Sequence, residues 1–261
     1  MRRYLRLWGA FIANCITREM TFRFNFLFKV LFGSMWFVMT LIMFSVVFSH
    51  TQEIAGWSKY EVFFLLGVSH VILRLFESFF MENLLKVPDL IRDGELDFYL
   101  LKPVNPQFLI STRYASFDSL IDTLMGFATL GYALFMLHRT ATPLNMIEFV
   151  LLAINGVLLY YAIMVIFVTF SFWFTRFHVM EVWWQMTNVA RQPAEIFKGK
   201  LQFIFTFCVP MLVIANFPVK AYLDRLPWYL GLYGLGVTAC ALAGSSWFFA
   251  YALKRYRSAS S

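Results

Sequence analysis

The stretch KVPDLIRDGELDFYLLKPVNP, residues 86–106, decides how the rest of this sequence is organised. It is the longest polar interval between apolar segments of membrane-spanning quality. Pro88 suits the first position of a helix, where its missing N–H costs nothing, and Asp89 complements the positive helix N-terminus. Gly94 favours the left-handed conformation that ends helices. The stretch therefore predicts a short helix over residues 88–93.

This short helix is expected to serve as a contact surface. Its apolar residues are Leu90 and Ile91, and Arg92 and Asp93 complete its charged side. A helix of one or two turns is marginal alone in water, so it needs a partner surface to hold it. The alternative for these residues is an ordinary solvated loop.

The rest of the composition is that of an integral membrane protein. The 261 residues are 60% hydrophobic and 14% charged, against about 45–50% and about 25% in soluble domains. We predict an all-α membrane protein with a single transmembrane domain over residues 1–261. Six segments are long enough, or nearly so, to cross about 30 Å of hydrocarbon. They are residues 26–49, 61–82, 113–137, 146–174, 201–217 and 228–253. The fifth is the shortest and contains Pro210, which predicts a kink or a break.

Residues 2–24 predict an amphipathic helix at the membrane interface rather than a signal peptide. Apolar side chains recur at helical spacing, and basic ones occupy the other faces. A basic amphipathic helix that carries a tryptophan, here Trp8, tends to lie in the interface plane. The apolar positions are Leu5, Trp8, Ile12, Cys15, Ile16 and Met20.

Loop charges predict that both termini lie in the cytoplasm. With the N-terminus inside, most of the 22 Lys and Arg residues fall in cytoplasmic segments, as the positive-inside rule requires. The outer segments carry only Lys59, Arg139, Lys220 and Arg225. The net charge of +7 is then explained by basic residues in the cytoplasmic segments, which face anionic lipid. It does not indicate nucleic-acid binding.

This orientation places residues 86–106 in the cytoplasm and adds a second cytoplasmic stretch over residues 176–200. The second stretch contains RQPAEIFKG, residues 191–199. Pro193 is suited to open a short helix and Gly199 to close it. The candidate contact residues of this second cytoplasmic motif are Pro193, Glu195, Phe197 and Gly199.

Charged residues inside two of the predicted spans indicate a buried cluster. His70, Arg74 and Glu77 share one face of the second span, and Asp118 and Asp122 are four residues apart in the third. A central Arg costs at least about 2.5 kcal/mol on insertion scales unless it is paired or hydrated. If the two spans fold as an antiparallel hairpin about residue 97, Arg74 lies near residue 120. We therefore predict that Arg74 contacts Asp118 or Asp122.

Two interpretations of the cluster stay open. It fixes helix register as a buried ion-pair network, or it lines a hydrated substrate path and relays motion from the cytoplasmic helix. A stand-alone secondary transporter or channel would use Arg74, Asp118 and Asp122 in the second way.

The sequence carries no motif for catalysis or metal binding. It has no GxxxxGK[ST] phosphate loop, no HExxH and no GxSxG. Its cysteines, Cys15, Cys208 and Cys240, show neither paired spacing nor a CxxC. We predict no catalytic residues, no bound metal and no cofactor on this chain. A membrane enzyme acting on lipids is the third hypothesis, and no constellation supports it.

The arrangement resembles the membrane-spanning permeases of type-2 ABC exporters. Residues 94–104, GELDFYLLKPV, followed by Pro106, are similar to the G-x-[LI]-[DE]-x-x-L-x-[KR]-P run of bacterial permeases in the multidrug and antibiotic group. Residues 192–199, QPAEIFKG, resemble a second recurring run, which is followed by an apolar span with a proline, here Pro210.

The resemblance implies a division of labour. Separate ABC ATPase subunits would bind ATP and Mg, and residues 88–94 would form the coupling helix seated in the ATPase. A second permease chain, identical or related, would pair with this one in a bacterial cytoplasmic (inner) membrane and export a hydrophobic or amphipathic substrate. Several such exporters hold re-entrant helices between spans five and six, whereas residues 218–227 form a short loop here.

Overall fold

The computed structural model describes residues 2–21, 23–174 and 178–256. Phe22 and residues 175–177, which fall within the predicted interfacial helix and the predicted second cytoplasmic stretch, lie outside the described residues. So do the side chains of Leu5 and Met20. Within the described part the chain is almost wholly helical, as predicted.

A hairpin of two short antiparallel strands, β1 and β2, interrupts the helices. It pairs Glu53 with Ser58 and Ile54 with Trp57. Segments of π-helix and 3-10 helix are labelled η. In chain order the elements are α1 Arg2–Thr21, α2 Arg23–His50, β1 Glu53–Ile54, β2 Trp57–Ser58, α3 Lys59–Phe76, η1 Glu77–Met81, α4 Glu82–Leu85, α5 Val87–Arg92, α6 Leu96–Leu100, α7 Pro106–Thr112, α8 Phe117–Leu137, α9 Pro143–Thr169, η2 Phe170–Phe172, α10 Val179–Ala190, η3 Ala194–Ile196, α11 Lys200–Phe203, η4 Ile204–Cys208, α12 Met211–Tyr222 and α13 Trp228–Arg255.

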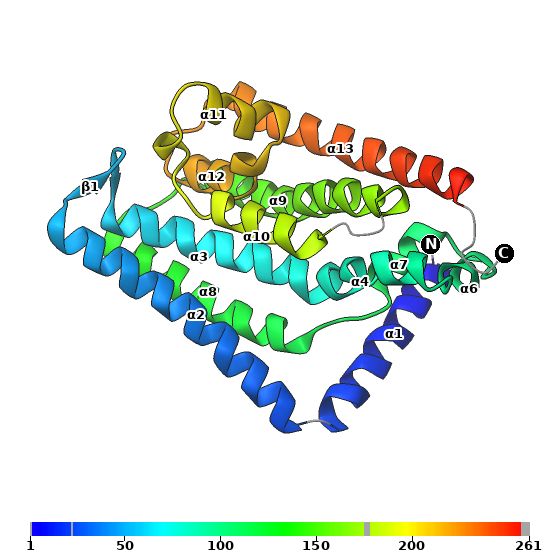
Figure 1. The fold of residues 1–261 in the computed structure, drawn as a ribbon. Helices are drawn as coiled ribbons and strands as arrows, with labels where there is room; N and C mark the ends of the chain where they lie inside the picture. The colour runs from blue at the N-terminus through cyan, green and yellow to red at the C-terminus, as the bar shows by residue number, and fades with distance from the viewer. Residues whose placement is uncertain (1, 22, 175–177, 257–261) are drawn as a thin grey trace.

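Helix α3 is the centre of the bundle. It packs against α8 on one side and against α9 and α12 on the other, while α2 lies outside α8 and α13 lies outside α9 (Figure 1). Most residues of α3 are therefore buried by its neighbours, whereas few residues of α2 are buried. In a membrane such an exposed apolar helix faces lipid or another polypeptide.

Small residues set the two closest helix contacts around α3 and α9. A Cβ added to Gly67 of α3 would lie 2.8 Å from the backbone nitrogen of Leu130 in α8. A Cβ added to Gly156 of α9 would lie 2.3 Å from the carbonyl oxygen of Ile214 in α12. Helices in membranes associate largely by van der Waals packing, so small residues at these crossings let the backbones approach.

Different elements lie at the two ends of the bundle (Figure 1). One end carries the β1–β2 hairpin, and the other carries α5, α6 and α7 together with the start of α1 and the C-terminal end of α13. Helix α1 is held at this second end, because the Tyr4 ring meets Phe108 edge-on at 4.9 Å between centroids. Cys15 is buried there and accepts a hydrogen bond from the backbone nitrogen of Ala115 at 3.4 Å.

Within the part of the chain that the structure describes, five helices or runs of helices are long and apolar enough to cross a membrane, or six segments if one bent pair is counted as a span. The predicted spans 26–49, 61–82, 146–174 and 228–253 overlap α2, α3, α9 and α13. The predicted span 113–137 begins later, at Phe117, because residues 113–116 link α7 to α8.

Residues 201–217 do not form the single span that hydropathy predicts. Helix α12 turns by 89° from the preceding α11–η4 pair, at Val209 and Pro210. Both ends of this bent pair lie together: the backbone nitrogen of Ala194 donates to Asn216 Oδ1 at 2.8 Å, and Glu195 forms an ion pair with Lys220. The pair is therefore a re-entrant hairpin that starts and finishes on one side of the bundle.

The predicted orientation puts residues 176–200 on the same side of the membrane as α5, but residues 191–199 lie at the opposite end of the bundle. Helix α10 leads from the α5 end toward the β1–β2 hairpin, where Trp57 Nε1 donates to Glu195 Oε2 at 2.8 Å. Hydropathy missed α10 because its 12 residues span only about 18 Å and include Glu181, Gln185 and Asn188.

We expect Gly156→Ala to lower the stability of the bundle by about 1–3 kcal/mol, the usual cost of overpacking a core. The new methyl group has to displace the α12 backbone at Ile214. Gly236→Ala is the matched control, because a Cβ at Gly236 meets nothing within 4 Å. Thermal unfolding in detergent measures both variants, and equal midpoints would contradict the close contact.

Candidate functional site

The short helix predicted at residues 88–93 is the end of the central helix rather than an isolated turn. Helices α3, η1, α4 and α5 form one nearly continuous run, Lys59–Arg92. Pro88 lies in the first turn of α5, where proline is tolerated. The helix ends at Asp93, and Gly94 follows with a left-handed φ of +73°. The predicted stop at Gly94 is therefore present.

Helix α5 presents its charged side outward and its apolar side inward. Asp89 and Arg92 have 61% and 59% of their side-chain surface exposed and are joined by an ion pair of 3.0 Å. Arg92 also donates hydrogen bonds to the carboxylate of Asp93. Leu90 is buried, since α5 packs against η2. The expectation that Leu90 enters a partner's groove is wrong, and Ile91 is only half exposed.

The apolar side chains that this end does expose come from α6. Phe98 is 67% exposed and Leu101, the residue after α6, is 81% exposed. Their neighbours Leu96 and Tyr99 point inward, and the Tyr99 hydroxyl accepts a 2.7 Å hydrogen bond from Arg113 Nη1. Burial raises the pKa of Tyr99, which keeps that hydroxyl neutral.

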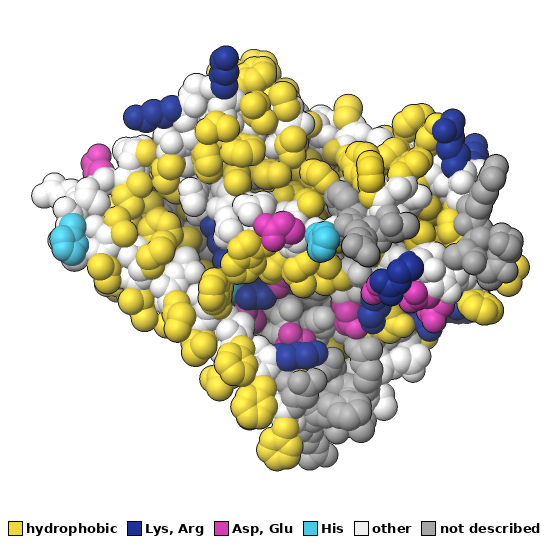
Figure 2. All heavy atoms as spheres, in the orientation of Figure 1, with side chains coloured by type: hydrophobic (Ala, Val, Ile, Leu, Met, Phe, Trp, Pro, Cys, Tyr) yellow, Lys and Arg dark blue, Asp and Glu magenta, His cyan; other side chains and the backbone are white. Residues whose placement is uncertain are grey.

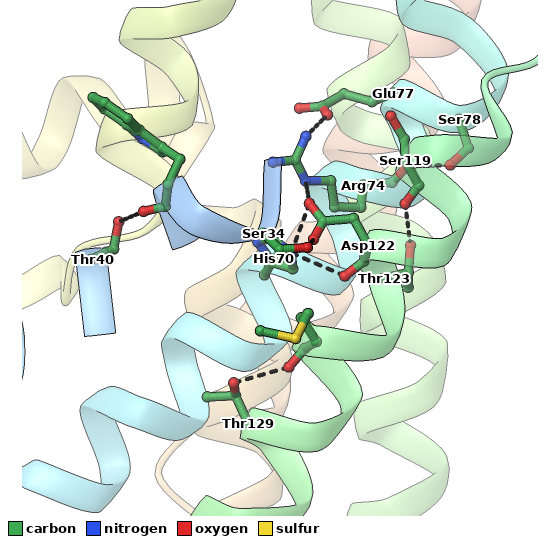
Figure 3. Close-up of polar contacts among 12 residues, drawn as sticks. Ser34, Thr40, His70, Arg74, Glu77, Ser78, Ser119, Asp122, Thr123 and Thr129 are labelled. Atoms are coloured by element: carbon green, nitrogen blue, oxygen red, sulfur yellow. Dashed lines mark hydrogen bonds and ion pairs between the residues drawn. The ribbon is translucent and has the colours of Figure 1, made fainter. Parts of the chain in front are cut away.

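A buried ion-pair cluster joins three helices in the middle of the bundle (Figure 3). Arg74 Nε lies 2.8 Å from Asp122 Oδ2, and Arg74 Nη1 donates to Glu77 Oε2. Asp122 also accepts a 2.9 Å hydrogen bond from Ser34 Oγ of α2. His70 Nε2 lies 3.6 Å from Asp122 Oδ2. Arg74 and Asp122 therefore connect α3 to α8, and Ser34 adds α2.

The predicted contact between Arg74 and Asp122 is present, whereas Asp118 takes no part in it. Among the described residues Asp118 forms no ion pair, and its buried Oδ1 has no hydrogen-bond partner. Sequence reasoning missed Ser34, because a single serine in an apolar span carries no signal. Only the packing of α2 on α8 shows that Ser34 faces the carboxylate of Asp122.

Sequence reasoning also missed Arg191, at the C-terminal end of α10. An arginine in a predicted cytoplasmic loop is unremarkable there, but Arg191 is only 9% exposed in the folded chain. Its burial follows from the position of α10 against α9 and α12.

The motif at residues 191–199 holds the re-entrant hairpin to the β1–β2 hairpin. Pro193 precedes η3, and Gly199 precedes α11 with a left-handed φ of +59°. Phe197 meets Phe205 edge-on at 5.3 Å. Burial tends to raise the pKa of Glu195, but the hydrogen bond and charge of Lys220 outweigh it, so the pKa lies below its ordinary value. Within the part of the chain that the structure describes, no three His, Cys, Asp or Glu residues are grouped to hold a metal ion.

A comparison with protein families decides what kind of protein this bundle is. The family model described as "ABC-2 family transporter protein" matches residues 34–260. The chain belongs to the ABC-2 transporter family. No curated protein and no solved structure matches it. As an ABC-2 permease it is a multi-pass membrane transport subunit, and its family implies association with ABC ATPase components.

In this ABC-2 permease, the two ends and the middle of the bundle carry different sets of polar and apolar side chains. The α5 end offers a charged surface with two exposed apolar side chains. The middle holds the Arg74 cluster, and the hairpin end holds the Glu195 contacts. The same central helix runs from the hairpin end to the α5 end.

We expect Asp122→Leu to destabilise the permease by about 3–5 kcal/mol, because it leaves a buried charge without its partner. The double variant Arg74→Leu with Asp122→Leu removes both charges and should recover most of that loss. Asp118→Leu is the control, since Asp118 makes no ion pair with any residue that the structure describes. Thermal unfolding of the unmodified chain, Arg74→Leu, Asp122→Leu and the double variant gives the coupling free energy, and additive losses would show that the pair is not coupled.

We expect Glu195→Gln to cost no more than about 1 kcal/mol at neutral pH, because the pair with Lys220 is partly exposed and screened by solvent. The folded-state pKa of Glu195 is lowered, so its contribution is present above the unfolded pKa and disappears as pH falls through the folded pKa. The difference in unfolding midpoint between the variant and the unmodified chain should therefore shrink toward acid pH. A difference that grows toward acid pH would contradict this assignment.

Proposed function

We propose that this permease receives an ABC ATPase subunit on the surface formed by Asp89, Arg92, Asp93, Phe98 and Leu101, here called the α5–α6 face. ATP and Mg bind to the ATPase, and this chain has no catalytic role and binds no cofactor. The proposal rests on family membership and on the exposure of these five side chains.

The composition of the α5–α6 face suits a compact protein interface. Such interfaces concentrate their energy in a few apolar anchors that a polar rim shields from water. Phe98 and Leu101 provide exposed apolar anchors, and the three charged residues of α5 provide the rim. Leu90, which the coupling-helix resemblance suggested as an anchor, instead fixes α5 to the permease itself.

The observation that carries the proposal is the continuity of the central helix. A push on α5 acts on the run Lys59–Arg92, which passes through the core beside α8, α9 and α12. Packed helices transmit displacement because the interior is close-packed and not compressible. The π segment η1 lies between Arg74 and α5, and such segments often occur at functional positions in helices. ATP-driven movement of the ATPase would thus reach the middle of the bundle.

A second permease chain, identical or related, completes the proposed transporter. Few residues of α2 are buried within this chain, and a second chain would cover part of its apolar surface. We place the protein in the cytoplasmic (inner) membrane of a bacterium with both termini and the α5–α6 face inside, as the loop charges favour. The cargo would be hydrophobic or amphipathic and would leave the cell. The stand-alone secondary transporter is the weaker candidate, because Asp118 is outside the ion-pair cluster and the family works with ATPases.

Phe98→Asp and Leu101→Asp should each reduce co-purification with the ABC ATPase at least tenfold, because each places a charge where the interface needs an apolar anchor. The experiment co-expresses the tagged permease with its candidate ATPase and measures the ATPase retained per permease. Insertion into the membrane should be unchanged, since both side chains are exposed.

Leu144→Asp is the matched control, because Leu144 is 72% exposed in the first turn of α9, at the hairpin end. It should retain the ATPase like the unmodified chain. If both α5–α6 variants bind the ATPase and support its substrate-stimulated hydrolysis normally, the docking assignment is wrong.

A further inference from the structure

A small cavity lies between α1 and the segment that links α7 to α8. Its volume is about 270 Å³, and it is lined by Phe11, Asn14 and Cys15 of α1 and by Arg113 and Tyr114 of the linking segment. Cys15 fixes the two walls to each other, because its thiol donates to the Arg113 carbonyl oxygen at 3.8 Å. The cavity therefore combines one cationic side chain, one amide and two aromatic rings on walls that are held together.

Arg113 carries a charge that the described part of the chain does not balance. Its Nη1 donates to the Tyr99 hydroxyl at 2.7 Å, and its guanidinium group forms no ion pair with any residue that the structure describes. Lys86 lies nearby, with its Nζ 3.5 Å from the centroid of the Tyr114 ring, and Arg113 Cζ lies 5.4 Å from the same centroid. Glu82 pairs with Lys86 at 2.8 Å. Lys86 is therefore already balanced, whereas Arg113 is available to an anion.

A wholly apolar groove runs along the central helix toward this end of the bundle. Its volume is about 450 Å³, and its walls come from residues 68–80, 127–130 and 149–158, in α3 and η1, α8 and α9. Every side chain that lines it is apolar, and Phe127 and Ile154 are exposed, so the groove opens on the surface of the bundle. It follows the central helix for roughly 18 Å. Such a groove favours an acyl chain over any polar group.

Two aromatic rings connect the groove to the α1 side of the cavity. Phe79 lines the groove, and its ring centroid lies 5.8 Å from that of Trp8 in α1. Trp8 and Phe11, which lines the cavity, are three residues apart and are therefore neighbours on one face of α1. These two α1 residues are only roughly 5 Å apart along the helix axis. One elongated molecule can therefore reach both features.

The cavity and the groove lie at the depths of a lipid head group and its chain. Arg113 follows α7 at the α5 end of the bundle, and the groove continues from that end toward the middle of α3. Figure 2 shows hydrophobic side chains along α2 and α13, and charged side chains of both signs toward the α5 end. Helix α1, which supplies one wall of the cavity, is the helix that the sequence places in the membrane interface. A lipid of the leaflet at this end would reach Arg113 with its head and the groove with its chain.

We propose that this permease binds an anionic membrane phospholipid, with the phosphate at Arg113 and one acyl chain in the groove between α3, α8 and α9. A guanidinium group binds phosphate through paired N–H donors, and basic pockets between membrane helices bind anionic head groups. The bound lipid would hold α1 against the central helix. In the orientation that the loop charges favour, it comes from the cytoplasmic leaflet. The site goes beyond the proposed function, because it requires neither the ATPase nor the cargo.

Native mass spectrometry of the full chain, released from detergent, tests this site. Titrations compare dioleoyl phosphatidylglycerol with dioleoyl phosphatidylcholine, with dioleoylglycerol, which lacks the phosphate, and with glycerol 3-phosphate, which lacks the chains. We expect one phosphatidylglycerol per permease chain, bound at least tenfold more tightly than the other three.

Each comparison can overturn one part of the proposal. Equal binding of phosphatidylcholine overturns the preference for an anionic lipid, and equal binding of dioleoylglycerol overturns the phosphate contact. If glycerol 3-phosphate binds as tightly, the ligand is a free anion and the groove takes no part. If the chain is released as a dimer that binds no phosphatidylglycerol, a second permease chain covers the groove and the lipid assignment is wrong.

Variants assign the head group to Arg113. Arg113→Gln should weaken phosphatidylglycerol binding at least tenfold, and Arg113→Lys should recover part of it by restoring the charge. Arg139→Gln is the matched control, because Arg139 donates to the Leu223 carbonyl oxygen elsewhere in the bundle. Unchanged affinity in Arg113→Gln overturns the proposal, and if that variant does not fold, the selectivity of the unmodified chain decides.

A second pair of variants assigns the acyl chain to the groove. Ala153→Phe places a ring in the groove and should weaken phosphatidylglycerol binding at least tenfold. Leu124→Phe is its control, because Leu124 is 64% exposed on α8 and does not line the groove. Equal affinities of these two variants would show that the chain does not lie in the groove.

Discussion

A charged residue in the middle of the most buried helix has to be neutralised, and the contacts of three helices follow from that requirement. Arg74 meets Asp122 at 2.8 Å, so α3 and α8 cannot slide past each other without separating the pair. Ser34 adds α2 through the same carboxylate. A partly buried pair of this kind contributes little net stability, but breaking it is costly, so it fixes which surfaces face each other. The close approach at Gly67 then becomes possible, because register brings it opposite Leu130.

The central helix also connects the two ends of the permease. It starts beside the β1–β2 hairpin, passes Arg74 and finishes as α5 on the α5–α6 face. A protein that must respond to an ATPase on one side of a membrane benefits from a single stiff element through its core. At the opposite end, Glu195 holds Trp57 and Lys220 together, so the re-entrant hairpin and the β1–β2 hairpin are linked.

The re-entrant hairpin shows how a segment with the hydropathy of a span can fail to cross. Residues 201–217 are mostly apolar, yet Pro210 lacks an N–H and the chain turns there by 89°. Contacts of α12 with its neighbours stabilise this bent arrangement. Ile214 packs against Gly156, and the Asn216 side chain forms hydrogen bonds with the backbone at residues 192 and 194. Irregular backbone at membrane depth is tolerated only where protein or water satisfies its polar groups.

The sequence by itself determined the class of the protein, the positions of most long helices, the end of α5 at Gly94 and that Arg74 meets an acid of the third span. These follow from local properties: hydropathy over a span, the conformational preference of glycine, and the high cost of an unpaired charge in lipid. Only the tertiary structure decided that this acid is Asp122 rather than Asp118, that Leu90 faces inward, that residues 191–199 lie at the hairpin end, and that Arg191 is buried. The reason is that these outcomes depend on which helices become neighbours. Hydropathy averaged along the chain does not register the burial that Tyr160 and α12 give to the short, partly polar α10.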